Sequence, residues 1–80
     1  MEDREVIARI GELVAKEHGL EQRHLGEGLK PDEAAELREL EVALDQCWDL
    51  LRQRRARRAA GLDPDEAEVR PASTVEGYRQ

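Results

Sequence analysis

The chain has 80 residues and a mass of 9.1 kDa, which is enough for one small domain and excludes a multidomain enzyme. Charged residues make up 40% of the chain and aromatic residues 2%, so a core would have to be built from Leu, Ile and Val. No apolar run approaches the ~20 residues of a membrane span, and the N-terminus lacks the layout of a signal peptide. The single cysteine, Cys47, excludes an intrachain disulfide and fits a reducing compartment. We therefore expect a cytoplasmic protein without membrane contact.

The net charge of -6 is unevenly distributed along the chain. Residues 1–51 contain 14 acidic and 6 basic residues, whereas residues 52–60 contain five arginines and no acidic residue. The last twenty residues contain five acidic residues and two arginines. A short basic segment, residues 52–58, thus lies between two acidic ones, which is the first indication of a binding function.

A first amphipathic helix is predicted over residues 4–25. Its inward stripe consists of apolar residues that are three or four positions apart once Glu17 is counted within the stripe: Val6, Ile10, Leu13 and Leu20. Acidic residues also lie near its start, where the helix dipole favours negative charge.

A second helix is predicted over residues 31–60. Gly26 and Gly28 interrupt the first period, and Pro31 follows at a position suited to the first turn of a helix. Gly61 is suited to the left-handed position after the last turn. The inward stripe of this helix repeats at three and four residues: Leu37, Leu40, Leu44, Cys47 and Leu51. Because this helix is longer than the first, its basic end should overhang.

These helices predict an all-α fold, an antiparallel two-helix hairpin with coiled-coil-like packing over residues 1–61. Folding about Gly28 places Val6 near Leu51 and Ile10 near Cys47, so the two inward stripes match in length. Large apolar residues beside the stripes would stay exposed in a single hairpin: Ile7, Val14, Val42, Trp48 and Leu50. We therefore expect the hairpin to dimerise into a four-helix bundle or to dock on the helices of a partner.

Residues 62–80 have no sustained period and are predicted to form an irregular acidic tail, with Val69, Val75 or Tyr78 as anchors. Since this tail follows the basic segment directly, it should fold back toward the arginines. Exposed ion pairs are weak, so we expect a loose, salt-sensitive cover.

One set of side chains is a candidate metal site. Glu17, Glu21 and His24 are spaced four and three residues apart, which puts two carboxylates and an imidazole on one helical face. The Glu-x-x-His spacing is used by di-iron carboxylate bundles. It also arises readily by chance in a Glu-rich helix, and we favour a polar layer near the loop that fixes the register of the helices. We expect no metal and no cofactor.

The basic segment has an alternative interpretation as a nucleotide or nucleic-acid site, because guanidinium groups bind phosphate well. The rest of the chain is acidic and would repel DNA, and aromatic platforms for single strands are missing, so we expect nucleic-acid binding to be absent. Cys47 has no partner thiol, so catalysis by this thiol is not expected.

From Leu44 to Ala56 the string LDQCWDLLRQRRA, followed by DPDEA, VRP and VEGY, resembles a family of small uncharacterised actinobacterial proteins that carry a domain of unknown function. The resemblance extends over nearly the whole chain and implies no particular chemistry.

The sequence thus favours a non-enzymatic helical interaction module, a regulatory or adaptor protein that binds a protein partner and itself. A metal-binding bundle and a nucleotide or nucleic-acid binder are the alternatives. The residues expected to bind the partner combine the apolar flank of the second helix with the basic segment: Trp48, Leu50, Arg52, Arg54, Arg55 and Arg58.

Overall fold

The structure is a computed structural model that describes residues 2–23 and 28–75. It contains two long helices, α1 (Asp3–Arg23) and α2 (Pro31–Ala59), followed by a short 3-10 turn, η1 (Pro64–Glu66), and a single helical turn, α3 (Ala72–Val75). The first helix begins one residue before the predicted start, and residues 24 and 25 of the predicted helix lie outside the described residues. The second begins at the predicted Pro31 and ends one residue before the predicted end.

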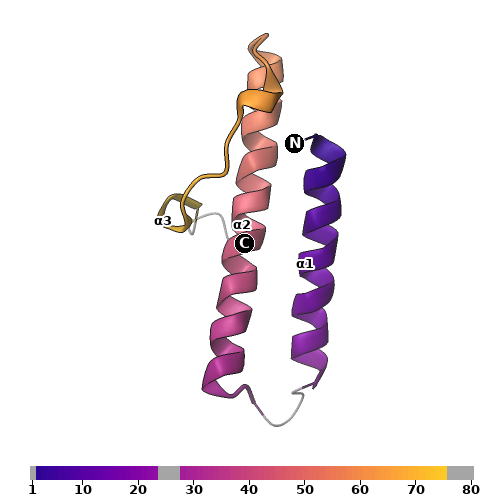
Figure 1. Cartoon of the computed structure of the whole chain (residues 1–80), viewed down its shortest axis with the longest axis vertical. Helices are drawn as coiled ribbons and strands as arrows, with labels where there is room; N and C mark the ends of the chain where they lie inside the picture. The colour runs from indigo at the N-terminus through magenta and orange to yellow at the C-terminus, as the bar shows by residue number, and fades with distance from the viewer. Residues whose placement is uncertain (1, 24–27, 76–80) are drawn as a thin grey trace.

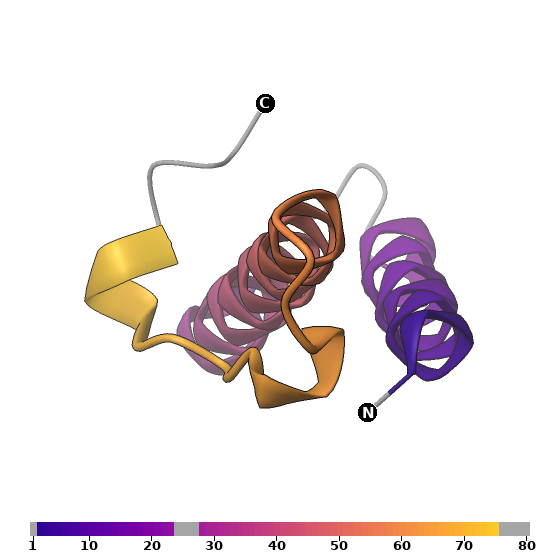
Figure 2. The ribbon, with the colours of Figure 1, turned by 90° about the horizontal axis from the view of Figure 1, so that it is seen from above.

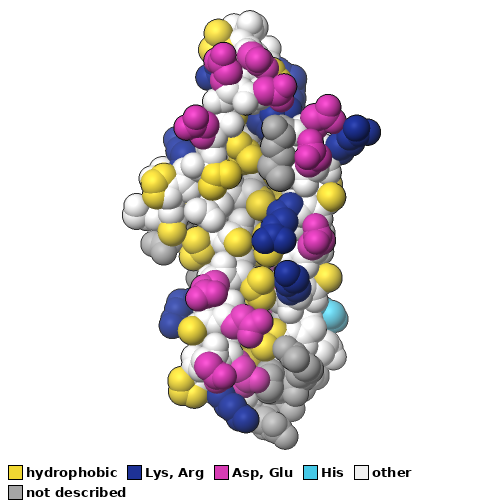
Figure 3. Space-filling view, in the orientation of Figure 1, with side chains coloured by type: hydrophobic (Ala, Val, Ile, Leu, Met, Phe, Trp, Pro, Cys, Tyr) yellow, Lys and Arg dark blue, Asp and Glu magenta, His cyan; other side chains and the backbone are white. Residues whose placement is uncertain are grey.

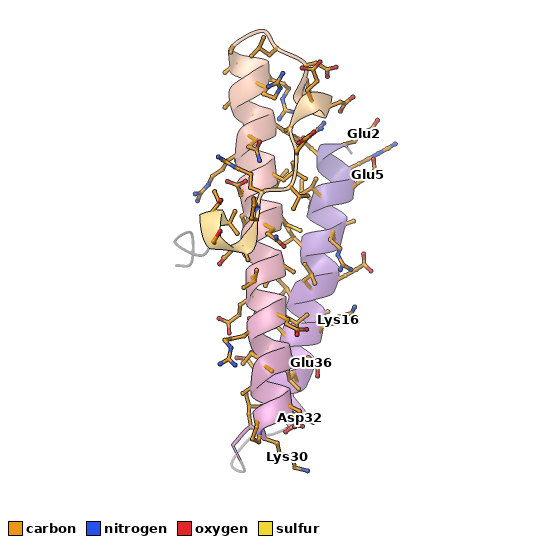
Figure 4. All side chains as sticks on the ribbon, turned by 60° about the vertical axis from the view of Figure 1, so that its left-hand side comes forward. Glu2, Glu5, Lys16, Lys30, Asp32 and Glu36 are labelled. Carbon is orange, nitrogen blue, oxygen red and sulfur yellow. The ribbon has the colours of Figure 1, made fainter. Side chains whose placement is uncertain are left out.

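Both long helices begin with the same local hydrogen bond. The backbone N–H of Glu2 donates to Oε1 of Glu5 over 2.9 Å, and the backbone N–H of Lys30 donates to Oε1 of Glu33 over 3.0 Å. In each case a glutamate in the first turn satisfies the N–H of the residue that precedes the helix. Figure 4 shows Glu2 and Glu5 at the start of α1, with Lys30 at the opposite end of the molecule.

The end of α2 is set by Gly61, whose φ of 75° belongs to the left-handed region. The N–H of Gly61 donates to the carbonyl of Arg58, and the N–H of Leu62 donates to the carbonyl of Arg57, at 3.1 and 2.7 Å. This pair of bonds is the Schellman motif, which reverses the chain direction after a helix. The tail is thereby turned back along the side of α2, as Figure 1 shows.

The two long helices pack against each other as an antiparallel hairpin (Figure 1). The buried apolar residues come mainly from the predicted inward stripes: Val6, Ile10, Leu13, Leu20, Leu50, Leu51 and Val75. Val6 and Ile10 of α1 share one core cluster with Leu51 of α2, and Cys47 packs against that cluster. The predicted all-α hairpin is therefore confirmed.

The region after α2 differs from the predicted loose tail. Seen from above in Figure 2, this segment first places η1 close to the start of α1 and then leads to α3, which lies on the side of α2 away from α1. Val75 of α3 is fully buried, whereas Val69 is exposed; Tyr78 lies outside the described residues. The tail is thus anchored by packing as well as by charge, because α3, which carries the buried Val75, contacts α2.

Candidate functional site

One buried arginine joins three parts of the chain. Arg54 of α2 donates through Nε to Asp3 of α1 and through Nη1 to the carboxylate of Asp65, at 2.9 Å. The same Nη1 donates to the carbonyl of Pro64 over 3.1 Å. We call the side chains of Asp3, Arg54 and Asp65 the arginine clasp. It connects the start of α1, the overhanging end of α2 and η1.

Hydrogen bonds from guanidinium groups set the charge of the clasp. Those from Arg58 and then Arg54 hold the pKa of Asp3 at about 2, below its ordinary 3.8. Hydrogen bonds to Asp3 and Asp65 in turn raise the pKa of Arg54. Both partners therefore stay ionised, because each favours the charged form of the other.

The clasp changes the predicted role of the basic segment. Arg54 is only 5% exposed, so its side chain is enclosed within the molecule and does not offer the surface contact expected from the sequence. Arg58 pairs with Asp3 at 2.7 Å, and Arg57 pairs with Glu66 at 2.7 Å. Arg54, Arg57 and Arg58 of the segment are thus engaged in ion pairs within the molecule. The expected pairing between the acidic tail and the basic segment is observed at Arg54 and Arg57.

A second charged contact attaches the tail to the middle of α2. The carboxylate of Asp49 is fully buried and accepts hydrogen bonds from Nε and Nη2 of Arg70 at 2.9 and 2.8 Å. Gln53 donates to the same carboxylate over 2.9 Å and to the carbonyl of Glu68 over 2.7 Å. Gln46 donates to the carbonyl of Arg70 over 3.1 Å. A polar stripe of α2 therefore holds the segment between η1 and α3.

Sequence reasoning missed this polar stripe. Gln46, Asp49 and Gln53 are spaced three and four residues apart, which places them on one side of α2, opposite the inward stripe. That spacing was visible in the sequence and could have indicated a second packing side. Arg70, the partner of Gln46 and Asp49, could not be identified, because no local pattern connects Asp49 with a residue 21 positions further along the chain.

A groove of about 220 Å³ lies between α1, α2 and the tail. Its lining is mostly apolar and includes Leu13, Cys47 and Val69, with Arg9 at its edge. Figure 3 shows basic side chains next to hydrophobic ones along this face of the hairpin. Partial burial raises the pKa of the Cys47 thiol, and the positive charge of Arg9 opposes this rise. The raised pKa favours the protonated thiol, as expected for a packed rather than a reactive cysteine.

Three large apolar side chains remain exposed on the long helices: Ile7 at 55%, Val14 at 46% and Trp48 at 47%. Each directly follows an inward residue, namely Val6, Leu13 and Cys47. One residue corresponds to a turn of about 100° around a helix, and in an antiparallel pair this turn leads to the same side from both helices. The three side chains therefore share one face of the hairpin, which we call the uncovered face.

Leu50 does not belong to the uncovered face. It is 4% exposed and lies in the core cluster with Val6, Ile10 and Leu51, with Ala67 of the tail packed against that cluster. Leu50 is therefore packed within the chain and does not offer the exposed contact expected from the sequence. The hairpin alone would leave Leu50 beside the inward stripe, and the tail completes its burial. The other predicted residues are exposed: Trp48, Arg52, Arg55 and Arg58.

The candidate metal ligands are only partly described. Glu17 is half-buried and Glu21 is exposed, while His24 lies outside the described residues. Within residues 2–23 and 28–75, no three metal-binding side chains are grouped as a metal site would need. None of the helices in these ranges is both long and apolar enough to cross a membrane.

Residues 2–80 match a family described as "Protein of unknown function (DUF2630)". The chain is also similar to uncharacterized proteins of Mycobacterium bovis and of Mycobacterium tuberculosis strain H37Rv. Each is 55% identical over 78 residues, which cover 95% of this chain and 88% of the relative. No solved structure matches the chain significantly. Because the family match spans nearly the whole length and the resemblance seen in the sequence agrees with it, the chain belongs to the DUF2630 family of actinobacterial proteins.

Proposed function

We propose that this protein is a non-enzymatic helical interaction module of the cytoplasm that binds a protein partner through the uncovered face. The observation that supports this proposal is the unequal covering of α2. One side of the helix packs on α1 and another is covered by the tail, which is held by Asp49, Arg54 and Arg57. The side that carries Trp48 is left exposed together with Ile7 and Val14 of α1.

The chemistry of the uncovered face favours a protein partner. Aromatic side chains contribute strongly to the centres of protein interfaces, since they bury a large area with few rotatable bonds. Trp48 is the chain's only tryptophan, and it lies about half exposed instead of in the core. Covering this side chain and its two aliphatic neighbours would remove apolar surface that a small hairpin cannot bury alone.

The nucleic-acid alternative receives less support from the same contacts. A phosphate would have to compete with Asp3, Asp65 and Glu66 for Arg54, Arg57 and Arg58. Each of these acidic groups is already in place within the chain, so the entropy cost of bringing the charges together has been met on folding. A protein surface that covers Trp48 needs none of these pairs to break.

Site-specific photo-crosslinking in the native cell tests the proposal. A crosslinking amino acid at Val14 lies on the uncovered face, whereas the same amino acid at Glu12 lies two residues away on an exposed position that faces elsewhere. We expect discrete adducts from position 14 and not from position 12. Trp48→Asp in the chain with the crosslinker at position 14 should remove the adducts while the helicity stays unchanged.

Equal adduct patterns from positions 14 and 12, or adducts that persist with Trp48→Asp, would contradict binding through this face. Because Trp48 is exposed, its replacement leaves the core cluster intact, and loss of binding cannot be attributed to unfolding if circular dichroism is preserved.

A further inference from the structure

We infer that the tail occupies a docking site on α2 for an extended segment of a partner protein. That segment carries an arginine at the place of Arg70 and a larger apolar side chain at the place of Val69. The docking site lies on the side of α2 that the tail covers, so it is separate from the uncovered face and adds a second binding surface to the proposed function. In the free chain the tail acts as an intramolecular ligand, which a better-fitting segment displaces.

The polar stripe of α2 holds residues 67–71, between η1 and α3, through backbone carbonyl groups. Gln53 donates to the carbonyl of Glu68, and Gln46 donates to the carbonyl of Arg70, over 2.7 and 3.1 Å. The segment therefore runs antiparallel to α2. Because every peptide bond offers a carbonyl oxygen whatever the side chain, these two bonds fit any chain that passes along the stripe in this direction.

Asp49 gives the docking site its preference for arginine. Its carboxylate is fully buried in the middle of the polar stripe and accepts hydrogen bonds from Nε and Nη2 of Arg70, at 2.9 and 2.8 Å. A buried carboxylate that loses such a partner is strongly disfavoured. Lysine is a poor substitute, because its ammonium group lacks the planar fork that makes both bonds at once. A segment that displaces the tail must therefore bring an arginine of its own.

The tail fills the docking site incompletely, which leaves room for a better ligand. Val69, the residue before Arg70, lines the groove of about 220 Å³ but remains 61% exposed. Leu13 of α1 and Cys47 of α2 also line this groove. A longer apolar side chain at the place of Val69 would bury more of the groove lining, so a partner segment with such a residue should bind more tightly than the tail does.

A second copy of this chain is a weaker competitor for the docking site than a partner segment. The turn at Gly61 keeps the tail beside its own α2, and short connections of this kind give effective concentrations of about the millimolar range. The tail of a second copy makes identical contacts, so it competes only at comparable concentrations. A segment with a better fit competes at lower concentrations, which favours a different protein as the occupant.

Binding of a synthetic peptide to the full chain tests the inference. The peptide has the sequence of residues 62–75 and carries a fluorescent label, and its fluorescence anisotropy reports binding. Arg70→Ala in the full chain weakens the hold of its own tail, so this variant should bind the peptide about tenfold or more tightly than the original chain does. The control variant Arg4→Ala, which removes an exposed ion pair at the start of α1, should bind the peptide as the original chain does.

Two changes within the peptide test the stated chemistry without altering the protein. Val69→Leu in the peptide should strengthen its binding to the Arg70→Ala chain about threefold, because one more methylene group is buried in the groove. Arg70→Lys in the peptide should weaken binding about tenfold or more. If circular dichroism shows that the Arg70→Ala chain is unfolded, the same peptides are compared on the original chain, where the same order of affinities is expected.

The inference is overturned if the peptide binds the Arg70→Ala chain no more tightly than the original chain, since the tail is then a fixed part of the fold. It is also overturned if Val69→Leu does not strengthen binding or if Arg70→Lys does not weaken it. Self-association of the original chain that Arg70→Ala abolishes in sedimentation would identify a second copy as the occupant instead. None of these results involves Trp48, so they leave the proposed function to its own test.

Discussion

Replacing Arg70 with alanine tests whether the buried carboxylate of Asp49 holds the tail on α2. Arg70 makes two hydrogen bonds to Asp49, at 2.9 and 2.8 Å. The Asp49 side chain is fully buried, whereas that of Arg70 is 44% exposed. The pair is therefore intermediate between a buried and a surface ion pair.

The partial exposure of the Arg70–Asp49 pair sets the expected loss in the free energy of unfolding. Removing one partner of a fully buried pair costs about 3–5 kcal/mol, while an exposed pair contributes about 0–1 kcal/mol. After the substitution Gln53 still donates to Asp49, which reduces the penalty for the buried charge. We therefore expect Arg70→Ala to lower the free energy of unfolding by about 2 kcal/mol, in the range of hydrogen bonds to charged groups.

Urea unfolding followed by far-UV circular dichroism measures this change, and Arg4→Ala is the matched control. Arg4 also forms an ion pair, with Glu2 at 3.0 Å, but the side chains of both residues are largely exposed. Its replacement should change the free energy of unfolding by less than about 0.5 kcal/mol. Equal effects of Arg70→Ala and Arg4→Ala would show that burial of Asp49 adds nothing to the pair, and the reasoning would be refuted.

Two further predictions concern acid stability and helix glycines. The folded-state pKa of Asp3, about 2, lies below its ordinary 3.8, so its contribution to stability is present above about pH 4 and is lost as the pH falls toward 2. Asp3→Asn should accordingly lower the urea midpoint at pH 7. If the urea midpoints of the variant and the original chain still differ as much at pH 2, the ionised carboxylate of Asp3 is not the cause of the difference. Gly11→Ala and Gly19→Ala should each raise the free energy of unfolding of the monomer by about 0.5–1 kcal/mol, since neither added Cβ meets an atom within 4 Å.

The sequence by itself determined the hairpin, because its information is local. Apolar residues three and four positions apart specify an inward stripe for each helix, and Gly28, Pro31 and Gly61 mark where the helices are interrupted. The two inward stripes match in length, so an antiparallel pair of helices can bury both of them. The exposed position of Trp48 follows from the same periodicity, since it lies one residue beyond the inward stripe.

Only the tertiary structure decided what covers the side of α2 that does not pack on α1. Sequence reasoning assumed a single packing partner for this helix, so Leu50 and Arg54 were assigned to a free surface. In the structure, Ala67 packs against the cluster that contains Leu50, and Asp3 pairs with Arg54 across 51 residues of sequence. Such contacts are specified by shape and charge complementarity between distant segments, which helical periodicity does not encode.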